Sequence, residues 1–299
     1  MKSRLIKWMI PLLILGMLVG VERLSHLLTD GFGYADITSN LPYNPAWEVP
    51  FESEDQELIE SALHQTYHYL ESGSQSFVFM SEDKNYVIKF FKHKRWRLNP
   101  LLTSLPLPSS LALKRENWIE KKKETVNATF GSCKTAYTEF KKETGILFLH
   151  LNKTPHFNPI LTVKDRIGLK HQIPLGEVEF IIQKKAIPTP SYLLALKQEG
   201  KTKEAQKALS DLFSLTVMRA KKGYSDKDPH LIRNFGFIDG KGIELDVGGF
   251  HHDPKKDLNY FYNQELKRIH QKLIPWLERH YPELVPYAEE EMSTLSLNN

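Results

Sequence analysis

The sequence predicts an α+β fold, with a sheet-rich first half and a helical second half, in a chain of 299 residues. Three observations support this prediction. Short runs rich in aromatic and β-branched residues begin at FVFM and YVIKFF and recur up to residue 184. Beyond residue 190, apolar residues recur mostly at helical spacing. One short hairpin interrupts the helical half. Strands and helices are thus segregated along the chain, which is typical of α+β proteins, and the length allows one large domain or two lobes.

Composition argues against several classes of site. The net charge of +4 is mild, and acids interrupt the basic run at residues 114–123, so we expect a solvated helix face and no nucleic-acid partner. Cys133 is the only cysteine, which excludes an internal disulfide and a cysteine zinc site. His64 and His68 are four residues apart but lack the glutamate of a zinc-protease helix, so they predict surface residues.

The N-terminus carries an uncharged run, WMIPLLILGMLVGV, at residues 8–21. Basic residues before an apolar run are typical of a secretory signal or a short signal anchor. We therefore expect an anchor helix over residues 1–24 that contacts the membrane through residues 5–23. The charge rule then places the N-terminus in the cytoplasm and the domain outside it, in a single-pass protein. A buried core helix is the alternative, and cleavage of the segment stays open. The basic residues before the run are Lys2, Arg4 and Lys7.

Residues 25–52 predict a linker, because their last part is rich in proline and has little periodicity. Ser53 then predicts the N-cap of a helix that runs to Leu70. A hairpin over residues 72–91 follows, with its turn at SEDKN. We expect a helix over residues 132–144, which Gly145 ends. We also expect strands over residues 146–151, 163–173 and 178–184.

The helical half is predicted from residue 191 onward. Apolar spacing indicates helices over residues 191–198 and 202–221, and Gly223 ends the second helix. Asp239 and Gly240 join two short apolar runs, which is a strong hairpin signal. The chain is expected to finish with helices over residues 259–281 and 282–292.

Two segments of the first half have the composition of an anion site. Small residues in the loop ESGSQS let the backbone approach an anion closely, and these are Gly73, Ser74 and Ser76 among others. Lys89 lies on the strand that follows. Each signal is weak alone, because a Gly/Ser loop is usually a turn and a strand lysine usually points to solvent.

The stretch GYSDKDPHLIRNFGFIDGKGIELDVGGF at residues 223–250 is more specific. Asn234 and Asp246 are twelve residues apart, and one hairpin spans the interval. Both side chains should therefore lie at the same end of the hairpin, where their oxygen atoms could bind a cation. The glycines after Val247 permit an unusual backbone conformation.

These segments, in this order, resemble the protein-kinase-like superfamily. VIK resembles the strand that carries the phosphate-binding lysine, and the stretch at residues 223–250 resembles the catalytic loop and the Asp-Phe-Gly motif. The resemblance implies a bilobal fold with an antiparallel-sheet N-lobe that has one main helix, over residues 53–184. A mostly helical C-lobe would follow over residues 185–292. It also implies ATP as the nucleotide triphosphate and Mg²⁺ as the metal ion.

The resemblance assigns roles to the residues of the N-lobe and the hinge. Gly73, Ser74 and Ser76 would form a degenerate glycine-rich loop, and Val78 would cover the adenine. Lys89 would contact the α- and β-phosphates. The ion-pair partner of Lys89 would be Glu139, with Glu143 as the alternative one turn later, and the hinge at Gln183 to Ala186 would meet the adenine edge.

The C-lobe supplies the metal ligands and the base, and here the sequence departs from the family. Asn234 and Asp246 would be the two magnesium ligands. No His-Arg-Asp is present, and the catalytic aspartate should lie five residues before Asn234. Asp228 lies six before it and Asp226 eight before it, so Asp228 is the preferred base and Asp226 the alternative. Val247 replaces the usual phenylalanine.

Three functional hypotheses follow. The first is a membrane-anchored, ATP-dependent, kinase-like phosphotransferase, for which no motif names the phosphate acceptor. The second is a pseudokinase that acts as a nucleotide-binding or protein-interaction module. The third is a membrane-attached structural protein without a ligand, which leaves the ordered set of residues unexplained.

Overall fold

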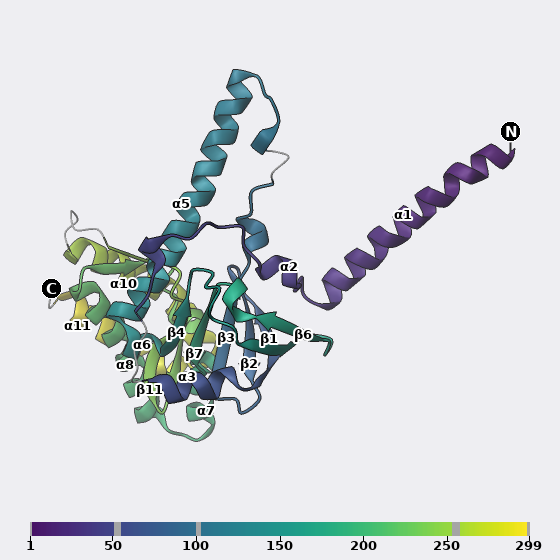
Figure 1. The fold of residues 1–299 in the computed structure, drawn as a ribbon. Coiled ribbons are helices and arrows are strands. Elements are labelled where there is room, and N and C mark those ends of the chain that lie inside the picture. The colour runs from purple at the N-terminus through teal and green to yellow at the C-terminus, as the bar shows by residue number, and fades with distance from the viewer. Residues whose placement is uncertain (1, 51–54, 100–102, 253–257, 298–299) are drawn as a thin grey trace. The chain divides into compact units, whose positions relative to one another are not determined.

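The structure is a computed structural model that describes residues 2–50, 55–99, 103–252 and 258–297 (Figure 1). The predicted N-cap Ser53 lies outside the described residues. The architecture is α+β, as the sequence predicted. The chain divides into two compact units, which we describe separately. Unit 1 comprises Met1–Tyr43, Glu57–Arg97 and Asn152–Phe180, and unit 2 comprises Asn44–Gln56, Leu98–Leu151 and Ile181–Asn299.

Unit 1 contains five adjacent strands in the order β3-β2-β1-β5-β6. β1 and β5 are parallel and the other neighbours are antiparallel. The predicted hairpin over residues 72–91 is confirmed as the pair β2 and β3. The predicted strand over residues 163–173 is instead the hairpin of β5 and β6. The strands are β1 (Thr66–Ser72), β2 (Ser76–Ser81), β3 (Tyr86–Phe91), β5 (Ile160–Lys164) and β6 (Lys170–Pro174), with 3-10 turns η3 (His93–Arg95) and η4 (Leu175–Glu177).

The helix expected to reach Leu70 is shorter than predicted. Helix α3 (Gln56–Leu63) ends before β1, whose second residue Tyr67 is fully buried. Tyr67 is paired with Ser81 of β2 on one side and with Val163 of β5 on the other. Aromatic side chains favour a strand when neighbouring strands cover them, and this tertiary pairing overrides the helical spacing of the sequence.

The N-terminal segment contributes to the core of unit 1. Phe32 is buried and its ring lies 5.3 Å from that of Phe77 and 4.8 Å from that of Phe79. Ile37, in the short helix α2 (Tyr34–Ile37), is fully buried. Ser39 donates a hydrogen bond to Glu179. Residues of the segment predicted as a linker therefore pack against the sheet.

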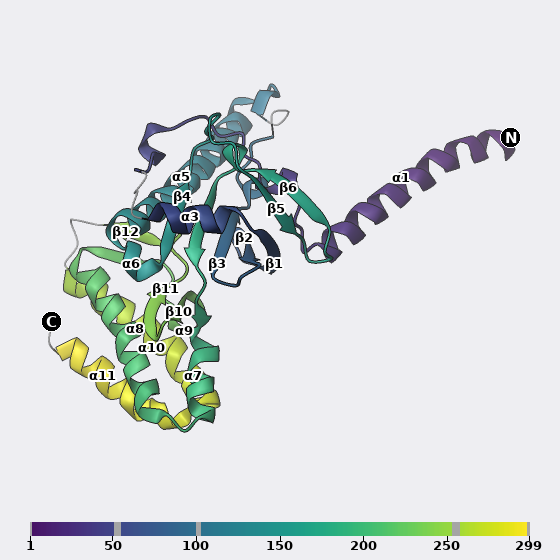
Figure 2. The same ribbon diagram turned by 60° about the horizontal axis from the view of Figure 1, so that its bottom comes forward.

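Helix α1 (Lys2–Leu28) extends away from the strands of unit 1 in both views (Figures 1 and 2). Within the described residues, none of the helices combines the length and the apolar character that crossing a bilayer requires. The predicted single-pass topology, with an anchor over residues 5–23 and an extracytoplasmic domain, is therefore wrong. The physical reason is length, because the uncharged residues 8–21 cover only ~21 Å as a helix and the hydrocarbon core is ~30 Å thick.

Unit 2 begins with one long helix and two neighbouring strands. Helix α5 (Ser109–Glu139) starts directly after Pro108, and the basic run at residues 114–123 is mostly exposed on it. The helix predicted over residues 132–144 is instead the end of α5 and a separate turn of helix after Phe140. Gly145 ends that turn in the left-handed conformation, with φ 65°, as predicted. The remaining elements of this part are η1 (Pro45–Trp47), α6 (Lys141–Thr144), β4 (Ile146–His150) and its neighbour β7 (Phe180–Lys184).

The rest of unit 2 is mainly helical, and its predicted helices are confirmed. Helices α7, α8, α10 and α11 lie together around one apolar core (Figure 2). The helices are α7 (Thr189–Gln198), α8 (Thr202–Lys221), α9 (Leu231–Asn234), α10 (Leu258–His280), η5 (Pro282–Leu284) and α11 (Val285–Leu297). The strands are β8 (Ile187–Pro188), β9 (Tyr224–Asp226), β10 (Phe235–Ile238), β11 (Lys241–Glu244) and β12 (Phe250–His252).

Candidate functional site

The hairpin of β10 and β11 brings two of the predicted site residues together. Asp239 and Gly240 form its turn with φ angles of 50° and 75°, which is the left-handed geometry that Asp-Gly favours. At the other end, the N–H groups of Leu245 and Asp246 lie 2.6 and 3.4 Å from the carbonyl oxygen of Asn234. Asn234 and Asp246 are therefore adjacent, as their twelve-residue spacing predicted.

The side chain of Asn234 has a fixed orientation. It is buried, and its Nδ2 donates a hydrogen bond of 2.8 Å to the carbonyl oxygen of Asp228. Because the nitrogen is engaged, the amide oxygen Oδ1 is the atom that can accept or coordinate. This bond also ties the loop that contains Asp228 to the end of the hairpin.

Asp228 is an accessible carboxylate. Its side chain is 56% exposed and forms an ion pair with Lys272 of α10. The hydrogen bond from Lys272, helped by the charge of that lysine, holds the pKa of Asp228 below its ordinary value. Asp228 is therefore ionised at neutral pH and can accept a proton or orient a hydroxyl group.

Asp226 lies in a different environment. It is only 2% exposed, and burial raises its pKa, an effect that the positive charge of Arg219 opposes. One oxygen, Oδ1, accepts a hydrogen bond of 3.1 Å from the backbone N–H of Asp228. The other oxygen, Oδ2, has no hydrogen-bond partner in the described part of the chain. The buried side chain of Asp226 thus stabilises the backbone of the loop at Asp228, whereas the side chain of Asp228 faces solvent.

The loop after Asp246 is tightly held. The N–H of Gly248 lies 3.2 Å from Oδ1 of Asp246, which fixes the exposed carboxylate at the start of the loop. Ser132 of α5 donates a hydrogen bond to the carbonyl oxygen of Val247 and accepts one of 2.6 Å from the N–H of Phe250. A Cβ atom at Gly249 would overlap with the carboxylate of Asp226, so this position requires glycine.

A buried ionic cluster lies next to this loop. Arg219 of α8 is fully buried and forms ion pairs with Glu244 of β11 and Glu265 of α10. Its guanidinium carbon lies 5.1 Å from the centre of the Phe250 ring. Burial raises the pKa of both glutamates, although Arg219 opposes the shift. Arg219 therefore connects two strands and two helices around Asp226.

Sequence reasoning missed this cluster, and only one signal pointed to it. Leu212, Thr216 and Arg219 are buried at helical spacing on α8, so a charged residue occupies a position of the apolar face. No sequence feature singled out Ser132, Glu265 or Lys272, because their roles depend on distant elements.

Three residues of unit 2 were predicted to take part in nucleotide binding, and the structure shows what surrounds each of them. Glu139 is exposed at the end of α5, where its carbonyl oxygen accepts a hydrogen bond of 2.8 Å from Lys222. Gln183 is buried, and its Nε2 donates to the carbonyl oxygen of Thr144 at 2.5 Å. Ala186 is half-buried just before β8. The side chain of Gln183 is thus committed to the protein and does not face a ligand.

The remaining predicted residues are in unit 1. Val78 of β2 and Lys89 of β3 are paired across the two strands, so their side chains are on the same face of the sheet. Gly73 and Ser74 lie in the turn between β1 and β2, where the N–H of Gly73 lies 2.9 Å from the carbonyl oxygen of Ser76.

The donor set of unit 2 suits magnesium with phosphate. Within the described ranges, no three or more His, Cys, Asp or Glu side chains are grouped so that they could hold a metal ion. Magnesium bound with a nucleotide needs only one or two carboxylates, because phosphate oxygens and water complete its shell. The accessible carboxylate of Asp246 and Oδ1 of Asn234 fit that requirement.

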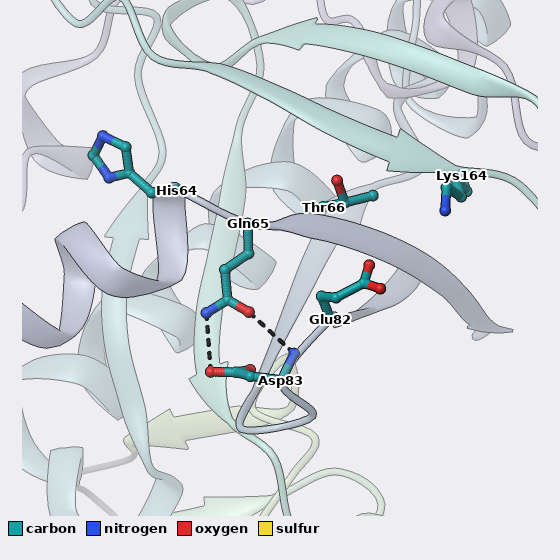
Figure 3. A pocket seen from close by; sticks show the side chains of 6 residues that line it. All are labelled: His64, Gln65, Thr66, Glu82, Asp83 and Lys164. Carbon is teal, nitrogen blue, oxygen red and sulfur yellow. Dashed lines mark hydrogen bonds between the residues drawn. The ribbon is translucent and has the colours of Figure 1, made fainter.

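A surface pocket of about 620 Å³ in unit 1 contains none of these residues (Figure 3). Gln65 and Asp83 form two hydrogen bonds with each other there, of 3.0 and 3.1 Å, and Glu82 forms an ion pair with His68. The side chains of Gln65, Asp83 and Glu82 are therefore already engaged, and we assign the pocket no ligand. Its lining is His64, Gln65, Thr66, Glu82, Asp83 and Lys164.

No family model and no curated protein matches this chain. Several solved structures are similar to it. The bifunctional kinase-methyltransferase WbdD is 14% identical with a TM-score of 0.31, over 73% of this chain and 43% of WbdD. The erythromycin complex of Rv3197 from Mycobacterium tuberculosis is 15% identical with a TM-score of 0.29, over 86% and 63% of the two chains. The streptomycin-ATP-APH(2")-IIa ternary complex is 12% identical with a TM-score of 0.24, over 82% and 99%.

This chain therefore spans less than half the length of WbdD.

Proposed function

We propose that this chain is an ATP-dependent phosphotransferase of the protein-kinase-like type, with the bilobal organisation of that superfamily. The observation that carries the proposal is the hydrogen-bonded series Asp228, Asn234 and Asp246 in unit 2. The amide of Asn234 bonds to the backbone of Asp228, and the backbone of Asp246 bonds to Asn234. One accessible ionised carboxylate thus lies beside a carboxylate and amide pair, which is the donor set that phosphoryl transfer requires.

In the proposed reaction, an acceptor hydroxyl oxygen forms a bond to the γ-phosphorus of ATP. The bond between this phosphorus and the bridging oxygen breaks, and ADP leaves with the electron pair. Asp228 accepts the proton of the hydroxyl group, because its carboxylate is ionised and its side chain is exposed. Asp246 and Asn234 would hold Mg²⁺, which neutralises charge on the phosphate oxygens.

Unit 1 contains the residues to which the resemblance assigns the phosphate contacts. Lys89 provides one positive charge, and the backbone of the turn at Gly73 provides N–H donors. Val78, on the same face as Lys89, provides apolar contact for the base.

We expect Mg-ATP to stabilise the full chain against thermal unfolding. A ligand that binds only the folded state adds ~2.7 kcal/mol at a concentration one hundredfold above its dissociation constant. The melting temperature, measured with and without Mg-ATP, should therefore rise. An unchanged melting temperature at millimolar Mg-ATP would contradict nucleotide binding.

The replacement Asp246→Asn is the control for the metal in this experiment. It removes the exposed carboxylate beside Asn234 and keeps its shape. We expect the variant to lose the part of the stabilisation that depends on magnesium. A variant as responsive to magnesium as the wild type would exclude Asp246 as a ligand.

The replacement Lys89→Met should weaken the response to Mg-ATP without unfolding the protein. The side chain is only partly buried, and a lysine on phosphate acts as a point charge. The matched control is Lys84→Met, an exposed lysine in the turn of the same hairpin. Circular dichroism should show the same fold for both variants, and an unfolded Lys89→Met variant would indicate a structural role instead.

A further inference from the structure

The turn between β1 and β2 is held by two basic side chains that the sequence did not single out. Nζ of Lys92 lies 2.6 Å from Oγ of Ser72 and 2.5 Å from the carbonyl oxygen of Gly73. Arg95 donates through Nη1 to the carbonyl oxygen of Ser74. The backbone N–H of Lys92 donates to the carbonyl oxygen of Gln75 at 2.8 Å. Three consecutive carbonyl groups of the turn are therefore bound by residues 92 and 95.

These contacts lie on one face of the sheet. Side chains alternate along a strand, so Phe77 and Phe90, which are paired across β2 and β3, share the face opposite to Val78 and Lys89. Nζ of Lys92 lies 4.5 Å from the centre of the Phe77 ring, so Lys92 is on the Phe77 face. The carbonyl groups of Gly73 and Ser74, which the two side chains bind, are therefore directed toward the Phe77 face. The carbonyl group of Gln75 bonds along the sheet to the backbone of Lys92.

The orientation of the carbonyl groups determines that of the amide groups. In a trans peptide, the C=O of one residue and the N–H of the next point in opposite directions. The N–H groups of Ser74 and Gln75, which follow the carbonyl groups of Gly73 and Ser74, are consequently directed away from the two basic side chains, toward the face of Val78 and Lys89. Successive N–H groups with a common direction form a concave site for anions.

The segment that carries the two basic residues is itself anchored. Lys92 is the residue before η3, and Arg95 is the last residue of η3. The first residue of η3, His93, is buried and lies 2.9 Å from the carboxylate of Glu179. Glu179 also accepts a hydrogen bond of 2.6 Å from Ser39. The segment of residues 92–95 is thus fixed through His93 and Glu179. These contacts do not involve the glycine of the turn.

We propose that Lys92 and Arg95 are positioning residues that orient the backbone N–H groups of Ser74 and Gln75 toward the phosphates of a nucleotide. They would replace the second and third glycines that a phosphate-binding loop normally uses. The inference rests on the proposed function for the identity of the ligand. It concerns the phosphate chain and not the base, so inorganic tripolyphosphate should bind the same turn.

The test is isothermal titration calorimetry of the full chain with Mg-ATP and with tripolyphosphate. We expect Lys92→Met and Arg95→Met each to weaken the binding of both ligands about tenfold, the loss that one or two hydrogen bonds would cause. Lys92→Arg, which keeps a cationic donor, should restore most of the affinity.

The matched control is Lys94→Met, which removes the same charge from the same segment. Nζ of Lys94 lies 3.3 Å from Asp36 and its side chain is 62% exposed, and it does not hold the turn. We expect this variant to bind both ligands as the wild type does. Equal losses in Lys94→Met and Lys92→Met would indicate general electrostatic attraction and overturn the inference, as would normal binding by Lys92→Met.

The outcome also separates this inference from the proposed function. Specific loss of binding in the Lys92 variant, in a chain without ATP turnover, would support the inference and contradict the phosphotransferase. Turnover that depends on Asp228, with unchanged binding in the Lys92 variant, would support the phosphotransferase and contradict the inference. A wild-type chain that binds neither ligand would overturn the inference as well.

Discussion

The replacement Asp228→Asn is expected to reduce phosphoryl transfer by ~10²- to 10⁴-fold while Mg-ATP still binds, because this is the usual contribution of a general base. The asparagine keeps the shape of the side chain and cannot accept the proton. Phosphate release from Mg-ATP measures turnover, and the shift in melting temperature measures binding. The structure supports this choice through the exposure of Asp228 and the ionised state of its carboxylate, which the hydrogen bond from Lys272 maintains.

Two further variants make this experiment decisive. Asp239→Asn, at the other end of the same hairpin, is exposed and should keep full turnover, because asparagine also adopts the left-handed conformation of that position. Asp226→Asn tests the alternative assignment. Turnover that survives in Asp228→Asn and is lost in Asp226→Asn would exchange the roles of the two aspartates. Binding without any turnover in the wild type would favour a pseudokinase.

The replacement Arg219→Met is expected to lower the free energy of unfolding by about 3 to 5 kcal/mol, the typical effect of removing one partner of a buried ion pair. It leaves Glu244 and Glu265 buried without their cation, and it removes the contact with the Phe250 ring. Denaturant unfolding of the full chain measures this change.

The controls for Arg219 separate charge from packing. Lys221→Met removes an exposed basic residue of the same helix and should change the free energy of unfolding by less than about 0.5 kcal/mol. The triple replacement of Arg219 by Met and of Glu244 and Glu265 by Leu should recover most of the lost stability, because it removes the unpaired charges. A stable Arg219→Met protein would show that the acids are neutral without their partner.

Local sequence signals determined much of this fold. Asp239 and Gly240 specify a tight turn by their backbone preferences alone, so the adjacency of Asn234 and Asp246 could be predicted. Gly145 and Gly223 end their helices in the left-handed conformation, which glycine adopts without a steric cost. Such features depend on neighbouring residues only. The apolar run at the N-terminus is also a local feature and could be recognised in the sequence. Its inferred role as a membrane anchor was wrong.

The tertiary structure decided which residues are buried, and burial decided their chemistry. Asp226 and Asp228 are two residues apart and equivalent in the sequence, yet Arg219 and Gly249 enclose one of them while Lys272 pairs with the other at the surface. The strand at Tyr67 formed because β2 and β5 cover its aromatic side chain. The contacts of Lys92 with the turn likewise depend on strand pairing. Electrostatic and packing energies depend on groups distant in the chain, and spacing along the sequence does not report those distances.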